Sequence, residues 1–380
     1  MRLIATIRDL EDLAHRLSGE RLIAADTEAA GYHRYMDRLC LLQLSTRDET
    51  WLVDTLAVGS LNPMAELFED PAVEVVFHDA DYDLRLLDRD FGIHVRGLFD
   101  TKIAARFVGE RSFGLASLLK ELVGVELEKK FQRADWAKRP LSQEMLDYAA
   151  TDTMYLSQLR DRLEQRLEQL GRLSWAQEEF RIAELTGWEP PEDEELSYQR
   201  LKGARDLDPR GLAALRELYA WRDGLAEDRD VAPFRVLNNR VLVELAALRP
   251  RDMDGLRDVP GLSDRNIQQH GEELMAALDR AGAVPDDELP RWPRGPRRPP
   301  RDPQVDARVD RLKAVRDRAA ERLELDRGFL MPRAQLEELA RAQPKDRAGL
   351  ADVESVRTWQ VEALGEELLE VLNRNGGNSN

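Results

Sequence analysis

The stretch RLIAADTE, residues 21–28, runs from apolar side chains into the acidic ending Asp26-Thr27-Glu28. Apolar runs of roughly four to eight residues are typical of buried strands. Three more such runs follow: LCLLQLST (39–46), TWLVDTL (50–56) and VEVVFHDA (73–80). Apolar residues at helical spacing appear between and after them, and the last stretch predicts one long helix over residues 142–170. Short strands with interleaved helices predict an α/β sheet domain over residues 1–172.

The acidic ending of the first strand is a candidate for half of a metal site. Alternate side chains of an extended strand point to one face, so Asp26 and Glu28 project together while Thr27 faces away. Two adjacent carboxylates repel each other unless a cation lies between them. Taken alone, the pair is a weak signal, and a solvated rim pair is its default interpretation.

Two further acidic positions have the same ambiguity. Asp83 follows the strand VEVVF near the start of a helix, where Asp79 or Asp81 could cap the helix and leave Asp83 merely in its first turn. Tyr148 and Asp152 are four residues apart and therefore share one helix face, which could simply be a surface face.

The three signals together favour a metal site. Hard divalent cations take oxygen ligands, and Mg²⁺ usually keeps few protein carboxylates. Carboxylates from three elements can hold two ions about 4 Å apart, a spacing that clamps the attacking and the leaving oxygen of a phosphodiester. We therefore expect two divalent ions, Mg²⁺ or Mn²⁺, on four carboxylates: Asp26, Glu28, Asp83 and Asp152.

The composition indicates a protein of two or three soluble domains, with 380 residues, of which 42% are hydrophobic and 34% charged. The net charge of −17 argues against a broad surface that coats nucleic acid. No apolar run approaches the roughly 18–20 residues of a membrane helix, and no signal peptide is recognisable. We expect a cytoplasmic location and no membrane partner. The single cysteine, Cys40, excludes an internal disulfide and a cysteine-based zinc cluster.

The second half of the chain contains an internal repeat. When the chain is shifted by 94 residues, 218–246 aligns with 312–340 without a gap. The repeat predicts two copies of one helical domain, and the organisation that we expect is a connecting segment at 173–207, domains at 208–283 and 305–374, and a proline- and arginine-rich segment at 284–304. The proline-rich segment is either a stiff solvated linker or a basic strap on phosphate.

A basic cluster precedes the third acidic position. It consists of Lys129, Lys130, Arg133, Lys138 and Arg139. Some of these side chains could guide an RNA end into the site, or they could form a solvated face. Trp136 beside them could stack on a base, or it could anchor the loop to the core.

These motifs resemble a known family. LIAADTE, HDADYDLRLL and YAATDTMYL resemble the DEDD exonuclease superfamily in its tyrosine subclass, and FQRADWAKRPLSQEMLDYAATD (131–152) resembles the ribonuclease D family. The repeated unit resembles the helicase-and-RNase-D C-terminal (HRDC) domain. The resemblance implies an α/β ribonuclease-H-like exonuclease domain followed by two all-α HRDC domains. It also implies a hydrolase, a 3′→5′ exoribonuclease that releases 5′-mononucleotides.

The resemblance assigns roles position by position. Asp26 would contact both metals, and Glu28 and Asp152 would complete the site that activates water. Asp83 would serve the second metal. Tyr148 would orient or help to deprotonate the attacking water. Thr27 and His78 would contact the substrate.

The implied partner is RNA with a free 3′ end, either precursor transfer RNA or another small structured RNA. The HRDC copies would bind nucleic acid or protein. The second copy has Val315 where the first has Trp221, and Pro332 where the first has Asn238, so it would be only a spacer if those positions bind nucleic acid. The alternatives are a DNA-directed 3′→5′ exonuclease, a non-catalytic nucleic-acid-binding scaffold and a protein-interaction array.

Overall fold

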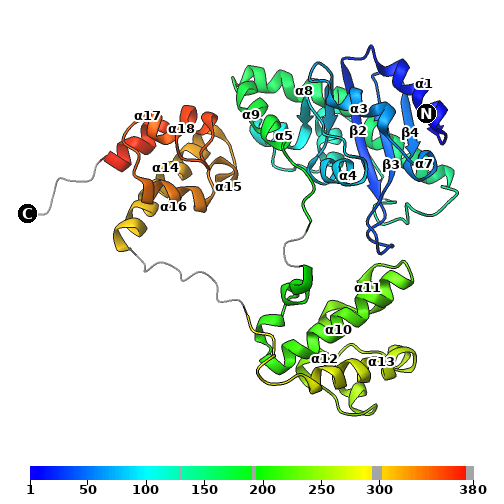
Figure 1. Cartoon of the computed structure of the whole chain (residues 1–380). Coiled ribbons are helices and arrows are strands. Elements are labelled where there is room, and N and C mark those ends of the chain that lie inside the picture. Colours follow the sequence, from blue (N-terminus) through cyan, green and yellow to red (C-terminus); the bar gives the residue numbers. More distant parts are fainter. Residues whose placement is uncertain (129, 191–193, 293–301, 374–380) are drawn as a thin grey trace, which may run out of the picture.

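A computed structural model describes residues 1–128, 130–190, 194–292 and 302–373 (Figure 1). The N-terminal part contains a mixed six-stranded sheet in the order β1-β4-β3-β2-β5-β6. β2 pairs antiparallel with β3 and parallel with β5. The strands are β1 (Arg2–Ile4), β2 (Leu22–Ala29), β3 (Leu39–Ser45), β4 (Thr50–Asp54), β5 (Glu74–Phe77) and β6 (Leu98–Asp100). The predicted α/β domain followed by helical domains is confirmed.

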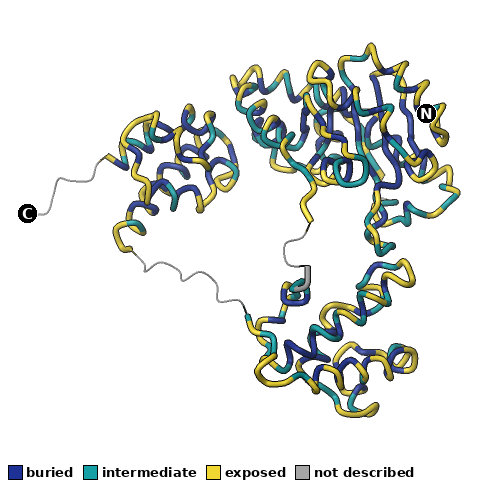
Figure 2. The backbone as a smooth tube through the Cα atoms, in the orientation of Figure 1, coloured by how far each residue is buried: buried dark blue, intermediate teal, exposed yellow. Residues whose placement is uncertain are grey.

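Helices cover both faces of this sheet. They are α1 (Ile7–Leu17), α2 (Thr55–Val58), α3 (Asn62–Glu69), α4 (Asp81–Phe91), α5 (Thr101–Phe107), α6 (Leu115–Leu118), a π-helical turn (Leu119–Val123), α7 (Gln143–Met154), α8 (Leu156–Gln169) and α9 (Leu173–Ala183). Leucines of α1 and α4 share one core with the sheet. Side chains of α5, α8 and α9 build a second core on Val76 and Phe99. Figure 2 shows these buried segments at the centre of the domain.

The prediction of a single helix over 142–170 is wrong. α7 ends at Met154 and α8 starts at Leu156, and Tyr155 (φ −108°, ψ −2°) lies between the two helices. The break allows the two helices to pack into different hydrophobic cores. Ala149 and Ala150 of α7 lie in a small core with Leu41 and Leu52 of the sheet, whereas Leu159 of α8 lies in the core that α5, α8 and α9 build.

Two helical bundles follow the sheet domain. The first bundle, residues 209–283, contains α10 (Pro209–Asp228), α11 (Pro233–Val236), α12 (Asn239–Leu248) and α13 (Asp264–Ala283). The second bundle, residues 303–373, contains α14 (Pro303–Leu323), α15 (Arg327–Leu330), α16 (Arg333–Ala342), α17 (Arg347–Ala351) and α18 (Thr358–Asn373). α10, α11, α12 and α13 each begin 94 residues before α14, α15, α16 and α18, the offset of the sequence repeat.

The expected connecting segment, residues 173–207, begins with a helix that packs on the sheet domain. α9 opens the expected connecting segment, yet Ala176 and Phe180 lie buried in the core with α5 and α8. The packed sheet domain therefore continues beyond residue 172. Short 3₁₀ turns at Glu194–Arg200 and Ala204–Asp206 lead into α10. Most of the arginines of the proline-rich segment, from Arg294 to Arg301, lie outside the described residues.

The second bundle folds back onto the sheet domain, an arrangement that the sequence left open. Trp359 of α18 has its ring centroid 5.0 Å from Phe107 and 5.7 Å from Trp175. Glu178 of α9 accepts hydrogen bonds from the backbone N–H groups of Thr358 (2.7 Å) and Trp359 (2.9 Å), at the N-terminus of α18. This contact is aromatic and largely buried, so it is a stable part of the fold.

The first bundle contacts a different part of the sheet domain, the loop after β2. The backbone N–H of Ala232 donates to the carbonyl of His33 at 3.2 Å. Both bundles thus contact the sheet domain, and residues 284–302 connect one bundle to the other (Figure 1). No helix in the described part of the chain is long and apolar enough to span a membrane.

Candidate active site

Three acidic side chains, Asp26, Glu28 and Asp152, line one pocket of about 340 Å³. β2 contributes Asp26 and Glu28, whose partners across the sheet are Gln43 and Leu41 of β3. The pocket is lined by Asp26, Thr27, Glu28, His78, Leu115, Gln132, Tyr148, Asp152 and Leu156. Asp83 lies beside it, since the charges of Asp26 and Glu28 are both coupled to it. The fold therefore brings all four predicted carboxylates together.

Asp83 is held by a side chain of β2. The Thr27 hydroxyl donates a hydrogen bond to the Asp83 carboxylate, and Thr27 lines the same pocket as Asp26 and Glu28. Asp83 is only 6% exposed. The threonine between the two acids is thus the contact that ties the third carboxylate to the strand.

Neither Asp79 nor Asp81 caps α4, which corrects the alternative considered for Asp83. The N-cap residue is Ala80, and Asp79 has φ +65°. The Asp100 carboxylate accepts from the N–H groups of Asp79 (3.2 Å) and Ala80 (2.8 Å), and also caps α5. Asp100 thereby holds the start of the helix that carries Asp83. The sequence offered no motif for this residue.

α7 presents Tyr148 and Asp152 to the pocket. Ser142 caps its N-terminus by accepting from Met145 N–H at 3.3 Å. Ala149 and Ala150 pack among Leu41 and Leu52, so the opposite side of the helix faces the acids. The small side chains allow α7 to lie close to the sheet.

Two aromatic rings hold Tyr148. The Phe131 ring lies 5.8 Å from it, edge on, and the Trp136 ring lies 6.3 Å away. Trp136 is 1% exposed. A buried indole cannot stack on a base, so the alternative that Trp136 anchors its loop to the core is the correct one.

Burial raises the pKa of every acid in the pocket. Burial and then the charge of Asp152 raise the pKa of Asp26 to about 8. Burial raises the pKa of Asp152 to about 7. The pKa values of Glu28 and Asp83 are raised well above the usual range by burial and by the negative charge of Asp26. Acids that are this costly to ionise together are stabilised by a cation.

The remaining polar groups of the pocket stay neutral. Burial, followed by the charge of Asp152, raises the pKa of the Tyr148 hydroxyl. Burial lowers the pKa of His78, whose Nδ1 lies 2.9 Å from the Thr101 hydroxyl. Both groups can therefore exchange hydrogen bonds with a substrate without a change of charge.

The donor set fits a hard divalent cation. All four candidate ligands are carboxylates, the oxygen donors that such ions prefer. Among the described residues, no group of three His, Cys, Asp or Glu side chains is already arranged as a cation site.

Three pocket residues were not predicted from the sequence. Leu115 and Leu156 are apolar wall residues that carry no motif. Gln132 belongs to the loop in which the sequence analysis considered the basic residues and Trp136 but not Gln132. Its neighbours Phe131 and Trp136 were the available signal, because aromatic residues that anchor a loop also fix the polar residue between them.

Two of the four described residues of the basic cluster form ion pairs with acidic side chains. Arg139 donates to both oxygens of the buried Asp54 (2.6 and 2.7 Å) and to the Cys40 carbonyl (2.9 Å). Lys130 pairs with Glu144 at 2.6 Å. Arg133 and Lys138 are exposed, and Lys129 lies outside the described residues. A role in guiding RNA is therefore proposed only for Arg133 and Lys138.

Comparison with known proteins places the chain among nucleases. A 3′-5′ exonuclease family model matches residues 1–168, and an HRDC model matches 211–278 and 305–372. Ribonuclease D of Gluconacetobacter diazotrophicus is 33% identical over 97% of this chain and 91% of its own. Ribonuclease D of Pseudomonas paraeruginosa is 33% identical over 97% of both chains. The crystal structure of Escherichia coli RNase D, an exoribonuclease involved in structured RNA processing, matches with a TM-score of 0.69 and 27% identity over 98% of each chain.

Proposed function

This chain belongs to the ribonuclease D family, and we propose that Asp26, Glu28, Asp83 and Asp152 hold its divalent metal ions. The chain is a hydrolase, a 3′→5′ exoribonuclease, as its sequence predicted. The DNA-directed alternative and the non-catalytic alternatives are not favoured. The observation that carries the metal assignment is the convergence of Asp26, Glu28, Asp152 and Tyr148 on one pocket, with the buried Asp83 beside it.

The pocket suits two ions, Mg²⁺ or Mn²⁺. When bound, such ions supply a water of lowered pKa and neutralise charge on the leaving oxygen. The charge of Asp26 acts on both Glu28 and Asp83, which supports Asp26 as the residue that would share both ions. Glu28 and Asp152 would complete one position, and Asp83 the other.

Tyr148 would orient the attacking water. Its raised pKa keeps the phenol protonated near neutral pH, so the hydroxyl donates a hydrogen bond and does not act as a base. The rings of Phe131 and Trp136 limit its rotation. Its contribution is therefore geometric.

His78 and Thr27 are proposed to contact the substrate. Both residues line the pocket. The neutral His78 imidazole can exchange a hydrogen bond with a terminal sugar or base. The Thr27 hydroxyl is already bonded to Asp83, so Thr27 would contact the substrate through its backbone.

The proposed substrate is RNA with a free 3′ end, as precursor transfer RNA or another small structured RNA in the cytoplasm. The domain boundaries that accompany this proposal are the exonuclease domain at 1–172, the connecting segment at 173–207, the HRDC domains at 208–283 and 305–374, and the linker at 284–304, with α9 of the connecting segment packed on the exonuclease domain. Support comes from the HRDC matches and from the structured-RNA role stated for the E. coli protein.

The test is digestion of a 5′-labelled single-stranded RNA and the matching DNA, with Mg²⁺, with Mn²⁺ and with EDTA. We expect a one-nucleotide ladder that shortens RNA from its 3′ end and that EDTA abolishes. Asp26→Asn should remove the activity. Asp81→Asn is the matched control, because Asp81 is an exposed acid on the helix of Asp83. Full activity of Asp26→Asn would overturn the metal assignment.

A further inference from the structure

The loop at residues 131–139 forms one wall of the pocket. It contributes Gln132 to the lining, and its Phe131 and Trp136 rings lie against Tyr148. The position of this loop therefore decides where Tyr148 and Gln132 stand relative to the carboxylates. A shift of the loop would move both side chains together.

The loop after β2, residues 30–38, holds the 131–139 loop by polar contacts. The Nε2 of His33 donates to the Arg133 carbonyl at 2.8 Å. Arg34 donates to both oxygens of Asp135, through Nη2 at 2.9 Å and Nε at 3.3 Å. Asp135 also accepts from Ala137 N–H at 3.2 Å, so the same carboxylate shapes the turn before Arg139. A two-point arginine–carboxylate pair constrains direction as well as distance.

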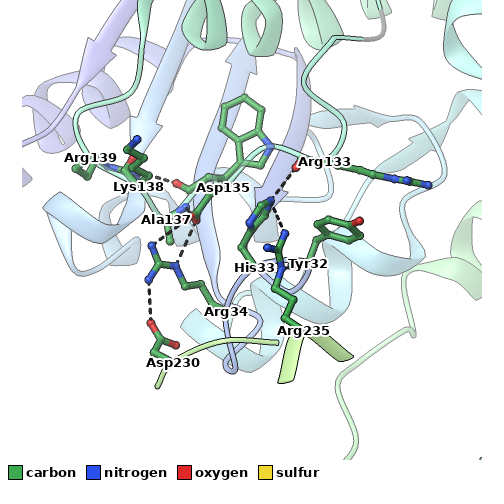
Figure 3. A network of polar contacts seen from close by, with 11 residues as sticks. Tyr32, His33, Arg34, Arg133, Asp135, Ala137, Lys138, Arg139, Asp230 and Arg235 are labelled. Atoms are coloured by element: carbon green, nitrogen blue, oxygen red, sulfur yellow. Dashed lines mark hydrogen bonds and ion pairs between the residues drawn. The ribbon is translucent and has the colours of Figure 1, made fainter. Parts of the chain in front are cut away.

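Residues of the first bundle in turn make polar contacts with the 30–38 loop, as Figure 3 shows for Asp230 and Arg235. Arg34 reaches Asp230 at 3.4 Å through Nη1, while its other nitrogens bind Asp135. Arg235 donates to the Tyr32 carbonyl at 2.9 Å and lies over the Tyr32 ring. Arg34 thus lies between the bundle and the pocket loop.

Further contacts bring the bundle to the same loop. Tyr35 donates its hydroxyl proton to Asp223 at 2.9 Å. The Phe234 ring lies 5.2 Å from the Tyr32 ring. Together with the Ala232–His33 backbone bond, these contacts cover residues 32–35, so the loop is held at consecutive positions.

The equivalent face of the second bundle makes a different kind of contact. At the 94-residue offset, Arg235 corresponds to Phe329, whose ring packs 4.8 Å from Phe107 of α5. The second contact is aromatic, whereas the first depends on charge and directional hydrogen bonds. Directional contacts contribute less to stability than to geometry.

We propose that the first bundle positions Tyr148 and Gln132 through Arg34 and the 131–139 loop, so that the bundle sets the rate of hydrolysis as well as contacting RNA. Arg34 and Arg235 are then positioning residues. This proposal rests on the proposed role of Tyr148 in orienting water. It gives the HRDC-like bundle a part in the chemistry even for a substrate too short to reach it.

The test measures kcat and KM for Arg34→Ala on a long single-stranded RNA and on the shortest oligoribonucleotide that the wild-type protein degrades. We expect kcat to fall about tenfold on both substrates with little change in KM, since misplacement of an aligned group by about 1 Å can cost up to about a hundredfold. The control is Arg47→Ala, which removes a similar two-point pair with Asp161 in the same domain. Arg34→Lys should show a smaller but definite loss, because lysine keeps the charge without the fork.

The bundle side is tested with Arg235→Ala, and Arg240→Ala is its control because Arg240 is exposed and pairs only within α12. Arg235→Ala should lower kcat on the short substrate, and Arg240→Ala should not. A loss seen only on long RNA, and only in KM, would overturn the proposal in favour of RNA binding alone.

Tyr148→Phe separates the proposed role of Tyr148 in orienting water from the proposed positioning of Tyr148 by the first bundle. If it leaves kcat unchanged, the role of Tyr148 fails. If it lowers kcat while Arg34→Ala and Arg235→Ala do not, the positioning proposal fails by itself.

Discussion

The Thr27 hydroxyl donates a hydrogen bond to the Asp83 carboxylate and thereby ties the middle of β2 to the first turn of α4. Asp26 and Glu28 flank this threonine in the strand, and all three residues line the pocket. One strand therefore supplies two carboxylates directly and orients a third. Hydrogen bonds of this kind to a ligand are known to tune metal affinity.

Thr27→Val should weaken metal binding while the fold is kept. Valine has nearly the same shape but cannot donate to Asp83, so the carboxylate loses its orientation. We expect the Mg²⁺ concentration for half-maximal activity to rise roughly tenfold, within the range of about ten- to a hundredfold for such partners. Metal titration of activity measures the effect. Thr27→Ser, which keeps the hydroxyl, should behave like the wild type, and equal metal dependence of all three proteins would contradict the prediction.

The metal-free protein should lose stability as the pH rises. The pKa of Asp26 is raised from 3.8 to about 8 in the folded state, so from about pH 4 upward the unfolded chain releases its proton while the folded chain keeps it. The penalty grows until the pH passes the folded pKa. Asp26→Asn removes this penalty and should raise the thermal midpoint in EDTA at pH 8 but not at pH 4. The expected gain in the free energy of unfolding at pH 8 is on the order of a few kcal/mol.

Divalent ions should reverse this pH effect in the wild-type protein. A bound cation favours the ionised carboxylates, so the midpoint should rise with metal concentration at pH 8. Asp26→Asn should respond much less. An equal response in both proteins, measured by thermal melts with and without Mg²⁺, would argue that the ions bind elsewhere.

Arg139→Ala should destabilise the sheet domain and act on RNA only indirectly. The substitution leaves the buried Asp54 carboxylate without its two-point partner. We expect a loss of about 2 kcal/mol, below the roughly 3–5 kcal/mol for a fully buried pair because Arg139 is half-buried. Thermal unfolding measures it. Lys138→Ala is the neighbouring control: it should leave the midpoint unchanged and reduce the salt dependence of RNA binding.

Trp359→Ala should release the second bundle from the sheet domain. The indole packs among Phe107, Trp175 and Phe329, and large-to-alanine changes in such cores cost about 3–5 kcal/mol. Faster proteolysis between residues 284 and 302, together with a larger radius in solution scattering, would report the release. Trp221→Ala in the first bundle is the control, because Trp221 is only partly buried and bonds within its own bundle to Glu273. Unchanged dimensions for Trp359→Ala would contradict the prediction.

The two repeats differ at the residue that precedes an equivalent helix, and the sequence did not reveal the role of that residue. Asn238, which was considered for nucleic-acid contact, caps α12 by accepting from Arg240 N–H at 2.8 Å. Pro332 occupies the same position before α16 without a side-chain cap. The substitution therefore changes a helix end, and gives no reason to assign either residue to RNA. A capping residue and a ligand-binding residue can have identical local sequence, so only the hydrogen bond separates them.

By itself, the sequence determined the local geometry of the site. The Asp-x-Glu pair shares a face because strands alternate, and Tyr148 and Asp152 share a face because helices repeat near four residues. It also determined the repeat and its 94-residue offset. Only the tertiary structure decided which charged side chains make structural contacts outside the pocket. Asp100 accepts hydrogen bonds at the start of α4, and Arg139 pairs with Asp54. Arg34 joins the first bundle to the loop that packs against Tyr148. Those partners lie 20 to 196 residues apart, and local periodicity carries no information about pairs that only the folded chain brings together.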